Sequence, residues 1–181
     1  TVRNVMWSLG RRRALLCAAL VPRAACSLVL NPAPPRWLSP VARDHPLVGT
    51  IWDTAAARPV AREVLVQRLA ASRFVLLGDK HDNPDHHRLQ AAVLDALVRC
   101  GRRPAVAFEP IAVDRGDALA AALARSLPTA KGVIEAVAQR DHGWDWDLYE
   151  PIVGSALRGR LRIIAADLDA AWVASVHAKG L

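Results

Sequence analysis

Short hydrophobic runs alternate with longer amphipathic stretches over most of the chain. Runs of strand length lie at residues 73–78, 104–109 and 161–166, and the first and third are rich in bulky aliphatic side chains. Such runs, bounded by glycine, proline or charged residues, predict buried β-strands.

The stretches between and before these runs have the spacing of helices. In residues 84–100 the apolar positions Leu89, Ala92, Val93 and Leu97 repeat at helical intervals, and a glycine follows the stretch. Further helices are expected at residues 60–71, 114–126, 130–139 and 147–158. Strands that alternate with helices predict an α/β domain with a parallel sheet flanked by helices.

A residue with a carboxylate side chain lies at or directly after the end of every expected strand. Asp79 follows the first run, Glu109 ends the second, and Asp167 follows the third. Because ligands of parallel α/β sheets bind at the carboxyl ends of strands, these three exits predict a common site.

The densest chemistry lies in residues 78–87, directly after the first expected strand. Gly78 permits a sharp turn, Asn83 can cap the following helix, Pro84 suits its first turn, and Asp85 matches the positive helix end. These residues therefore have structural explanations.

The three histidines of this segment do not have such an explanation. His81, His86 and His87 can act as metal ligands, proton carriers or haem contacts, or can belong to a solvated loop. His86 and His87 point about 100 degrees apart on a helix, so both do not easily serve one centre.

Charge is concentrated at the N-terminus. The formal net charge is +7, but residues 1–48 hold seven arginines and one acid, whereas residues 49–181 hold seventeen bases and sixteen acids. The expected folded part is nearly neutral, which argues against nucleic acid as a partner.

The N-terminal pattern is typical of a secretory signal peptide. A basic block at 11–13 precedes an apolar core at 14–21, which is too short to span a bilayer, and small residues follow. We expect a targeting segment at 1–30, with Cys26 a candidate for lipidation, a proline-rich linker at 31–48 and a domain at 49–181. The protein would then be exported, as a periplasmic or membrane-anchored protein of the bacterial envelope. The alternative is an ordinary basic and apolar N-terminal helix.

The run from Leu76 to Gln90 resembles the signature of the ChaN-like haem-binding uptake family of the Tiki superfamily. In that pattern a Gly-Glu-x-His turn leads into Asp-Asn-Pro-x-His-His and then Gln. Phe108-Glu109, the segment 144–152 and Ile164-Ala165-Ala166 resemble later family elements in the same order.

Three positions depart from the family pattern. Asp79 replaces the usual Glu, Pro110 replaces a larger apolar residue, and Asp167 replaces the usual Asn. Family members also continue beyond this point with a second Gly-x-x-His-type element. We therefore expect the N-terminal portion of an EreA/ChaN-like fold, with an incomplete sheet.

The resemblance implies a haem-binding, iron-regulated lipoprotein of bacterial iron uptake, with haems paired at a homodimer interface. Haem iron takes His, Tyr, Cys or Met as axial ligand. The chain has one tyrosine, Tyr149, and no CxxCH, so haem would bind non-covalently. Trp144 and Trp146 would either wall the pocket or pack in the core. The imidazole candidates are His81, His86, His87, His142 and His177.

Two alternatives to haem remain open from the sequence. The wider superfamily includes metal-dependent proteases and esterase-like hydrolases, and Asp79, His81 and Glu109 would then hold a divalent metal such as Mn, Co or Zn. The third interpretation is a truncated remnant that binds neither ligand. Binding is favoured over catalysis, because the second histidine element of the family is not in this sequence.

Overall fold

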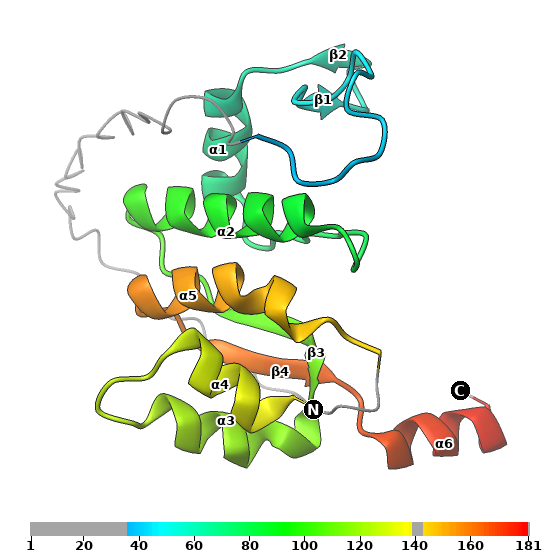
Figure 1. The fold of residues 1–181 in the computed structure, drawn as a ribbon, viewed down its shortest axis with the longest axis vertical. Helices are drawn as coiled ribbons and strands as arrows, with labels where there is room; N and C mark the ends of the chain where they lie inside the picture. The colour runs from blue at the N-terminus through cyan, green and yellow to red at the C-terminus, as the bar shows by residue number, and fades with distance from the viewer. Residues whose placement is uncertain (1–35, 139–142, 181) are drawn as a thin grey trace, which may run out of the picture.

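The computed structural model describes residues 36–138 and 143–180 (Figure 1). Its strands are β1 (Trp52–Asp53), β2 (Arg58–Pro59), β3 (Val106–Ala112) and β4 (Ile163–Asp167). Its α-helices are α1 (Arg62–Ala71), α2 (Pro84–Arg99), α3 (Gly116–Leu123), α4 (Ala130–Val137), α5 (Glu150–Arg158) and α6 (Ala170–Lys179). Single 3-10 turns at Val113–Arg115 and Trp146–Tyr149 lead into α3 and α5.

The centre of the fold is a parallel pair of strands. β3 pairs with β4 so that Val106 lies opposite Ile163 and Phe108 opposite Ala165, with an irregularity before Ala112. The connection between the strands runs through α3, α4 and α5. α5 contacts both α2 and α4, so the helices form one continuous packed group beside the strands (Figure 1). The prediction of an α/β domain with a parallel sheet and flanking helices is confirmed.

The hydrophobic core lies between these helices and the two strands. The side chains of Leu94, Ile111, Val133 and Val153 are at most 5 % exposed, and Ala156 is fully buried. They come from α2, β3, α4 and α5, which is how one core ties the helices to the sheet.

The start of α2 is fixed as the sequence predicts. The Asn83 side chain accepts a hydrogen bond from the Asp85 backbone N–H, and Pro84 occupies the first helical turn. An N-cap of this kind satisfies a backbone donor that the helix itself leaves free. The cap fixes where α2 begins and therefore the directions in which the side chains of His86 and His87 point.

The prediction of a strand at residues 73–78 is wrong for this structure. Residues 74–80 have no regular secondary structure, and the side chains of Phe74 and Leu76 are 79 % and 97 % exposed. A strand of a parallel sheet needs cover on both faces. Here a cavity separates this run from β3, whose ladder partner is β4. The part of the sheet that the structure describes therefore has two strands rather than three.

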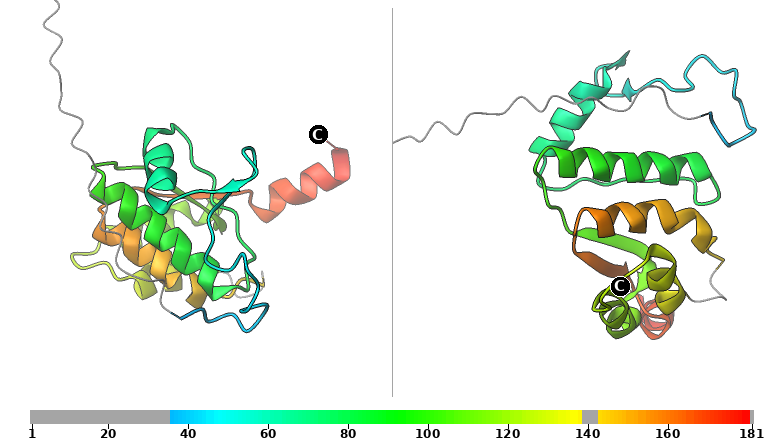
Figure 2. Two further views of the ribbon diagram at one scale, coloured as in Figure 1. Left: turned by 90° about the horizontal axis from the view of Figure 1, so that it is seen from above. Right: turned by 60° about the vertical axis from the view of Figure 1, so that its left-hand side comes forward.

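Two elements have no counterpart in the sequence prediction. β1 and β2 form a short antiparallel hairpin before α1. α6 begins at its N-cap Asp169, whose side chain accepts from Trp172 N–H, and it projects away from the body (Figure 2). No helix in residues 36–138 or 143–180 is long and apolar enough to cross a membrane.

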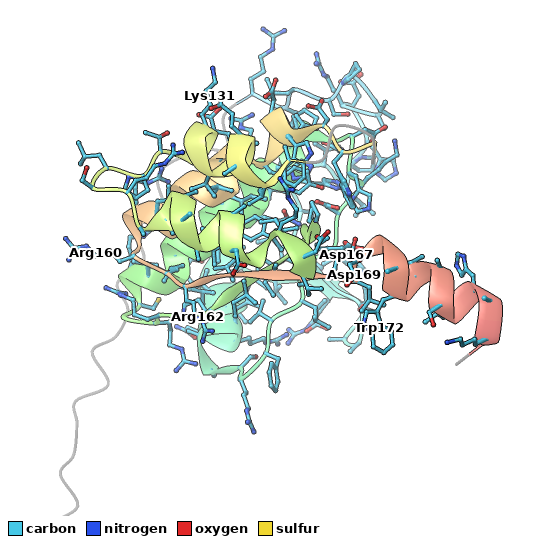
Figure 3. All side chains as sticks on the ribbon, turned by 90° about the horizontal axis from the view of Figure 1, so that it is seen from below. Lys131, Arg160, Arg162, Asp167, Asp169 and Trp172 are labelled. Carbon is cyan, nitrogen blue, oxygen red and sulfur yellow. The ribbon has the colours of Figure 1, made fainter. Side chains whose placement is uncertain are left out.

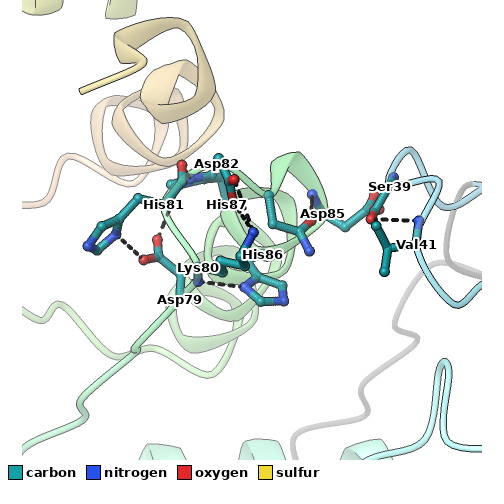
Figure 4. A network of polar contacts seen from close by, with 10 residues as sticks. Ser39, Val41, Asp79, Lys80, His81, Asp82, Asp85, His86 and His87 are labelled. Carbon is teal, nitrogen blue, oxygen red and sulfur yellow. Dashed lines mark hydrogen bonds and ion pairs between the residues drawn. The ribbon is translucent and has the colours of Figure 1, made fainter. Parts of the chain in front are cut away.

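Residues 36–49, which we call the N-terminal arm, lie against the start of α2. The backbone N–H groups of Leu38 and Ser39 each donate to Asp85 Oδ2 at 2.8 Å. Figure 4 shows Ser39 beside Asp85. Arg43 donates to the carbonyls of the same two residues, at 3.0 and 2.7 Å. The expected targeting segment at 1–30, with Cys26, lies outside the described residues, as does the start of the expected linker.

Candidate functional site

Aromatic rings and imidazoles meet where the loop after Gly78, the start of α2 and the approach to α5 converge. His87 packs edge-on against Tyr149 with ring centroids 4.5 Å apart, and His81 packs similarly against Trp144 at 4.6 Å. Trp144 and Trp146 both lie within about 6 Å of the Tyr149 ring. We call these five residues the aromatic–imidazole cluster.

The Asp79 carboxylate contacts both histidines of the cluster. Its side chain is 8 % exposed, and its Oδ1 accepts from His81 Nδ1 at 2.6 Å (Figure 4). Its Oδ2 accepts from Gln90 Nε2 at 3.3 Å and lies 3.5 Å from His87 Nδ1. Gln90 also donates to the Leu77 carbonyl at 2.9 Å, which fixes the loop to α2.

His87 is fully buried, and one of its ring nitrogens forms no hydrogen bond with the described residues. Its Nε2 lies 3.0 Å from the His81 carbonyl oxygen, which can only accept, so Nε2 carries the proton. Nδ1 has no hydrogen-bond partner in the described chain, and the nearest charged group that contacts it is Asp79 Oδ2, at 3.5 Å. An orphaned buried nitrogen of this kind is uncommon and marks a place where a bound group or proton can be accepted.

Tyr149 stands at the centre of the cluster and is 4 % exposed. Burial raises the pKa of its hydroxyl above the ordinary value, and the nearby carboxylates Asp79, Glu109 and Asp145 raise it further. Like charges nearby disfavour the phenolate, so the hydroxyl is held protonated in the absence of a bound cation.

A cavity of about 890 Å³ opens beside the cluster. Its lining includes the polar side chains of Asp79, His81, Glu109 and Tyr149 and apolar side chains such as Leu94 and Phe108. Three arginines also line it: Arg73, Arg102 and Arg103. This volume is within the usual range for ligand sites, which combine an apolar wall with a few polar groups. Two of the three carboxylates expected at a common site, Asp79 and Glu109, line this cavity, although Asp79 follows an irregular segment. The third, Asp167, is not among the lining residues.

The remaining sequence candidates lie elsewhere. His86 Nδ1 accepts from the Lys80 backbone N–H at 2.9 Å, and the ring lines a separate cavity of about 220 Å³ under the N-terminal arm. His177 is exposed on the projecting helix α6. His142 lies outside the described residues.

Metal ligation by Asp79, His81 and Glu109 finds no support in the geometry. Among residues 36–138 and 143–180, no group of three or more His, Cys, Asp or Glu side chains is arranged to hold a metal ion. Asp79 is already engaged with His81 and Gln90, whereas a divalent metal needs several free donors at short range.

Two further residues complete the surroundings of the site: Trp146, which the sequence suggested as a wall of the pocket, and Asp85, whose contact the sequence pattern does not predict. The Trp146 Nε1 donor is buried in the described chain without a partner, beside Tyr149. Asp85, which the sequence analysis explained by its charge at the helix end, binds the N-terminal arm through two backbone donors. No spacing rule links Asp85 to residues 38–39, because the contact spans 46 to 47 positions of the chain.

The fold and site define an α/β domain with a ligand-sized pocket of aromatic rings and imidazoles beside the carboxyl end of a parallel strand. The family model described as "Haem-binding uptake, Tiki superfamily, ChaN" matches residues 65–181. The chain belongs to this haem-binding uptake family, which confirms the resemblance carried by residues 76–90.

A solved structure shares the fold. The structure described as "Cofacial heme binding to ChaN of Campylobacter jejuni" superposes with a TM-score of 0.63 at 24 % sequence identity and covers 73 % of this chain. The match covers 53 % of the ChaN chain, so this sequence spans about half the length of that relative. No curated protein matches the sequence.

Proposed function

We propose that this chain binds haem non-covalently at the aromatic–imidazole cluster, with Tyr149 as the iron ligand. The observation that carries the proposal is the position of Tyr149. Its ring is clamped by His87, Trp144 and Trp146, and its hydroxyl forms no hydrogen bond with any residue that the structure describes. Family membership supports haem as the ligand.

The residues at the cavity fit the chemistry of haem. A phenol is one of the axial ligands that proteins use for haem iron. The cavity wall is largely apolar, as a porphyrin face requires, and His81 and Trp144 provide flat rings near Tyr149. His87 Nδ1, which has no hydrogen-bond partner in the described chain, is a further polar atom in the same cluster beside Asp79. His86, in the separate cavity, would contribute only if the arm and loop rearranged.

The raised pKa of Tyr149 supports a hydroxyl that stays neutral in the empty site and becomes a phenolate when iron binds. Three carboxylates make the phenolate unfavourable when the site holds no cation. A ferric centre supplies the positive charge that stabilises a phenolate, so the hydroxyl would lose its proton on ligation. The same carboxylates would then stabilise the site with ferric haem bound, because their negative charge attracts the iron.

The physiological role that we propose is haem or iron uptake in a bacterial envelope. Support comes from the family to which the chain belongs and from the signal-peptide pattern with Cys26 in the sequence. The solved ChaN structure from Campylobacter jejuni is described as one of cofacial haem binding. By analogy we propose a homodimer that brings two haems together.

Parallel titrations of the purified chain with haem and with Mn, Co and Zn test the ligand class. The proposal predicts a saturable Soret band with haem and no stoichiometric binding of the three metals. Stoichiometric metal binding that is lost in His81→Ala, with no Soret change, would instead support the hydrolase. If neither ligand binds to a chain with a cooperative unfolding transition, the remnant interpretation holds.

A further inference from the structure

Charges are segregated between the two ends of the β3–β4 sheet. Figure 3 shows Arg160 and Arg162 at the beginning of β4, and Asp167 and Asp169 where the strand ends and α6 begins. Asp79 and Glu109, at the haem end of the sheet, add to the acidic side. The net charge of residues 49–181 is close to zero, although one end of the sheet is basic and the other is acidic.

The basic end is built from several segments of the chain. Arg102 and Arg103 directly precede β3, and the Arg162 carbonyl accepts from Val106 N–H at 2.8 Å, which places the two strand starts side by side. Arg102 also donates to the Ser72 carbonyl at 3.5 Å, which brings the adjacent Arg73 to this end. Helices α2 and α5 run against the strands and therefore end here too. The basic face consists of Arg73, Arg99, Arg102, Arg103, Arg158, Arg160 and Arg162, and all seven are exposed.

These arginines are largely uncompensated. Arg158 pairs with Asp95 at 3.3 Å, whereas the other six form no ion pair with any residue that the structure describes. Uncompensated arginines on one face repel one another, and an anionic surface relieves that repulsion.

Exposed apolar side chains lie beside the basic face. The Arg73 guanidinium sits 5.3 Å from the centre of the Phe74 ring, and Phe74 and Leu76 are 79 % and 97 % exposed. Aromatic and aliphatic side chains next to cations are typical of proteins that bind at the lipid headgroup boundary, where the ring enters the interface. A nucleic-acid duplex supplies phosphates but no apolar phase for Leu76.

We propose that the basic face, with Phe74 and Leu76, docks on the surface of an anionic phospholipid bilayer. The acidic end of the sheet then points away from the lipid, and the docked face adjoins the cavity, because Arg73, Phe74 and Leu76 also line it. This surface belongs to the domain itself and does not depend on the leader or on Cys26.

Co-sedimentation of the full chain with vesicles tests the proposal. Vesicles of phosphatidylcholine alone are compared with vesicles that also contain phosphatidylglycerol. Wild type should bind the anionic vesicles and release them at high salt. Because each arginine near a charged bilayer contributes about 1 kcal/mol, Arg103→Glu/Arg162→Glu should weaken partitioning by about tenfold or more.

The matched control is Arg58→Glu/Lys179→Glu, which makes the same charge change on β2 and α6 and keeps the basic leader. It should bind nearly as wild type does. Phe74→Ser should weaken binding, whereas Trp172→Ala, an exposed aromatic on α6, should not. Circular dichroism confirms that each variant is folded.

Three results would overturn the proposal: equal losses in the two charge variants, equal binding of neutral and anionic vesicles, or no vesicle binding by the wild type. Binding of a duplex DNA that depends on Arg103 and Arg162, without vesicle binding, would assign the face to nucleic acid instead.

Discussion

His87 and Tyr149 form one packed unit, with ring centroids 4.5 Å apart and planes inclined at 63°. His87 comes from the first turn of α2, and Tyr149 immediately precedes α5. The α2–α5 interface is thus the framework of the site. Because His87 also contacts the His81 carbonyl, the same imidazole fixes the loop that carries Asp79.

The first prediction concerns His87→Ala. This change removes a fully buried ring, its contact with Tyr149 and its bond to the His81 carbonyl. We expect the free energy of unfolding to fall by about 2 to 4 kcal/mol, as for other large-to-small core changes. Urea denaturation measures it. His177→Ala, at an exposed position on α6, should change stability by less than about 0.5 kcal/mol. Equal effects of the two changes would mean that His87 is not the structural centre described.

The second prediction concerns the N-terminal arm. Asp85→Ala removes the carboxylate that accepts from Leu38 and Ser39, so the arm should leave α2. Trypsin should then cleave after Arg43 faster than in wild type, and mass spectrometry identifies the bond.

The free energy of unfolding of Asp85→Ala should fall by about 2 to 3 kcal/mol, because hydrogen bonds to a charged group are lost. Asp82→Ala is the control, since Asp82 is exposed and pairs only locally with Lys80. Unchanged cleavage in Asp85→Ala would contradict the docking.

The third prediction is the pH dependence of that contact. Burial by itself raises the pKa of Asp85, but hydrogen bonds from Ser39 and Leu38 and the charge of Arg88 outweigh it, so the pKa lies below its ordinary value. A carboxyl with a depressed folded pKa stabilises above its unfolded pKa of about 4, and that stabilisation is lost as pH falls through the folded value.

The difference in unfolding free energy between wild type and Asp85→Asn should therefore be constant from about pH 7 to pH 5 and shrink below about pH 4. Denaturation curves over this range measure it. A difference that grows in acid would reverse the sign and refute the ionised contact.

The fourth prediction concerns the approach of α5 to α2. A Cβ added at Gly159 would lie 2.8 Å from Val98 Cγ2 and 3.1 Å from Leu161 Cγ. Valine is stiff and Leu161 is buried, so Gly159→Ala should cost about 1 to 3 kcal/mol through overpacking. Gly116→Ala, where a Cβ meets nothing within 4 Å, should be neutral or stabilising. Similar thermal midpoints for the two variants would show that the helices can separate without cost.

Local signals in the sequence predicted much of this fold. The Asn83 cap with Pro84 set the start of α2, and the aliphatic runs around Phe108 and Ile163 identified β3 and β4. These features depend on neighbours within one turn or one strand, so the sequence pattern is sufficient. The grouping of Asp79 with Glu109 was expected from strand direction, but in the structure Asp79 follows an irregular segment rather than a strand.

Other features depend on partners far along the chain. Residues 73–78 have the composition of a buried strand, but strand formation requires a ladder partner and cover on both faces, which this structure does not provide. The docking of Leu38 on Asp85 and the burial of His87 against Tyr149 likewise join distant segments. Composition cannot distinguish His87, in the cluster, from His86, under the arm.

The most direct test of the central claim is the haem affinity of Tyr149→Phe, measured by Soret titration beside wild type. Phenylalanine keeps the ring that packs on His87 and removes only the hydroxyl, so the fold should persist. We predict a loss of affinity of about tenfold or more, with a shifted Soret band, because an axial ligand is removed. Wild-type affinity and an unchanged spectrum in Tyr149→Phe would contradict ligation by Tyr149.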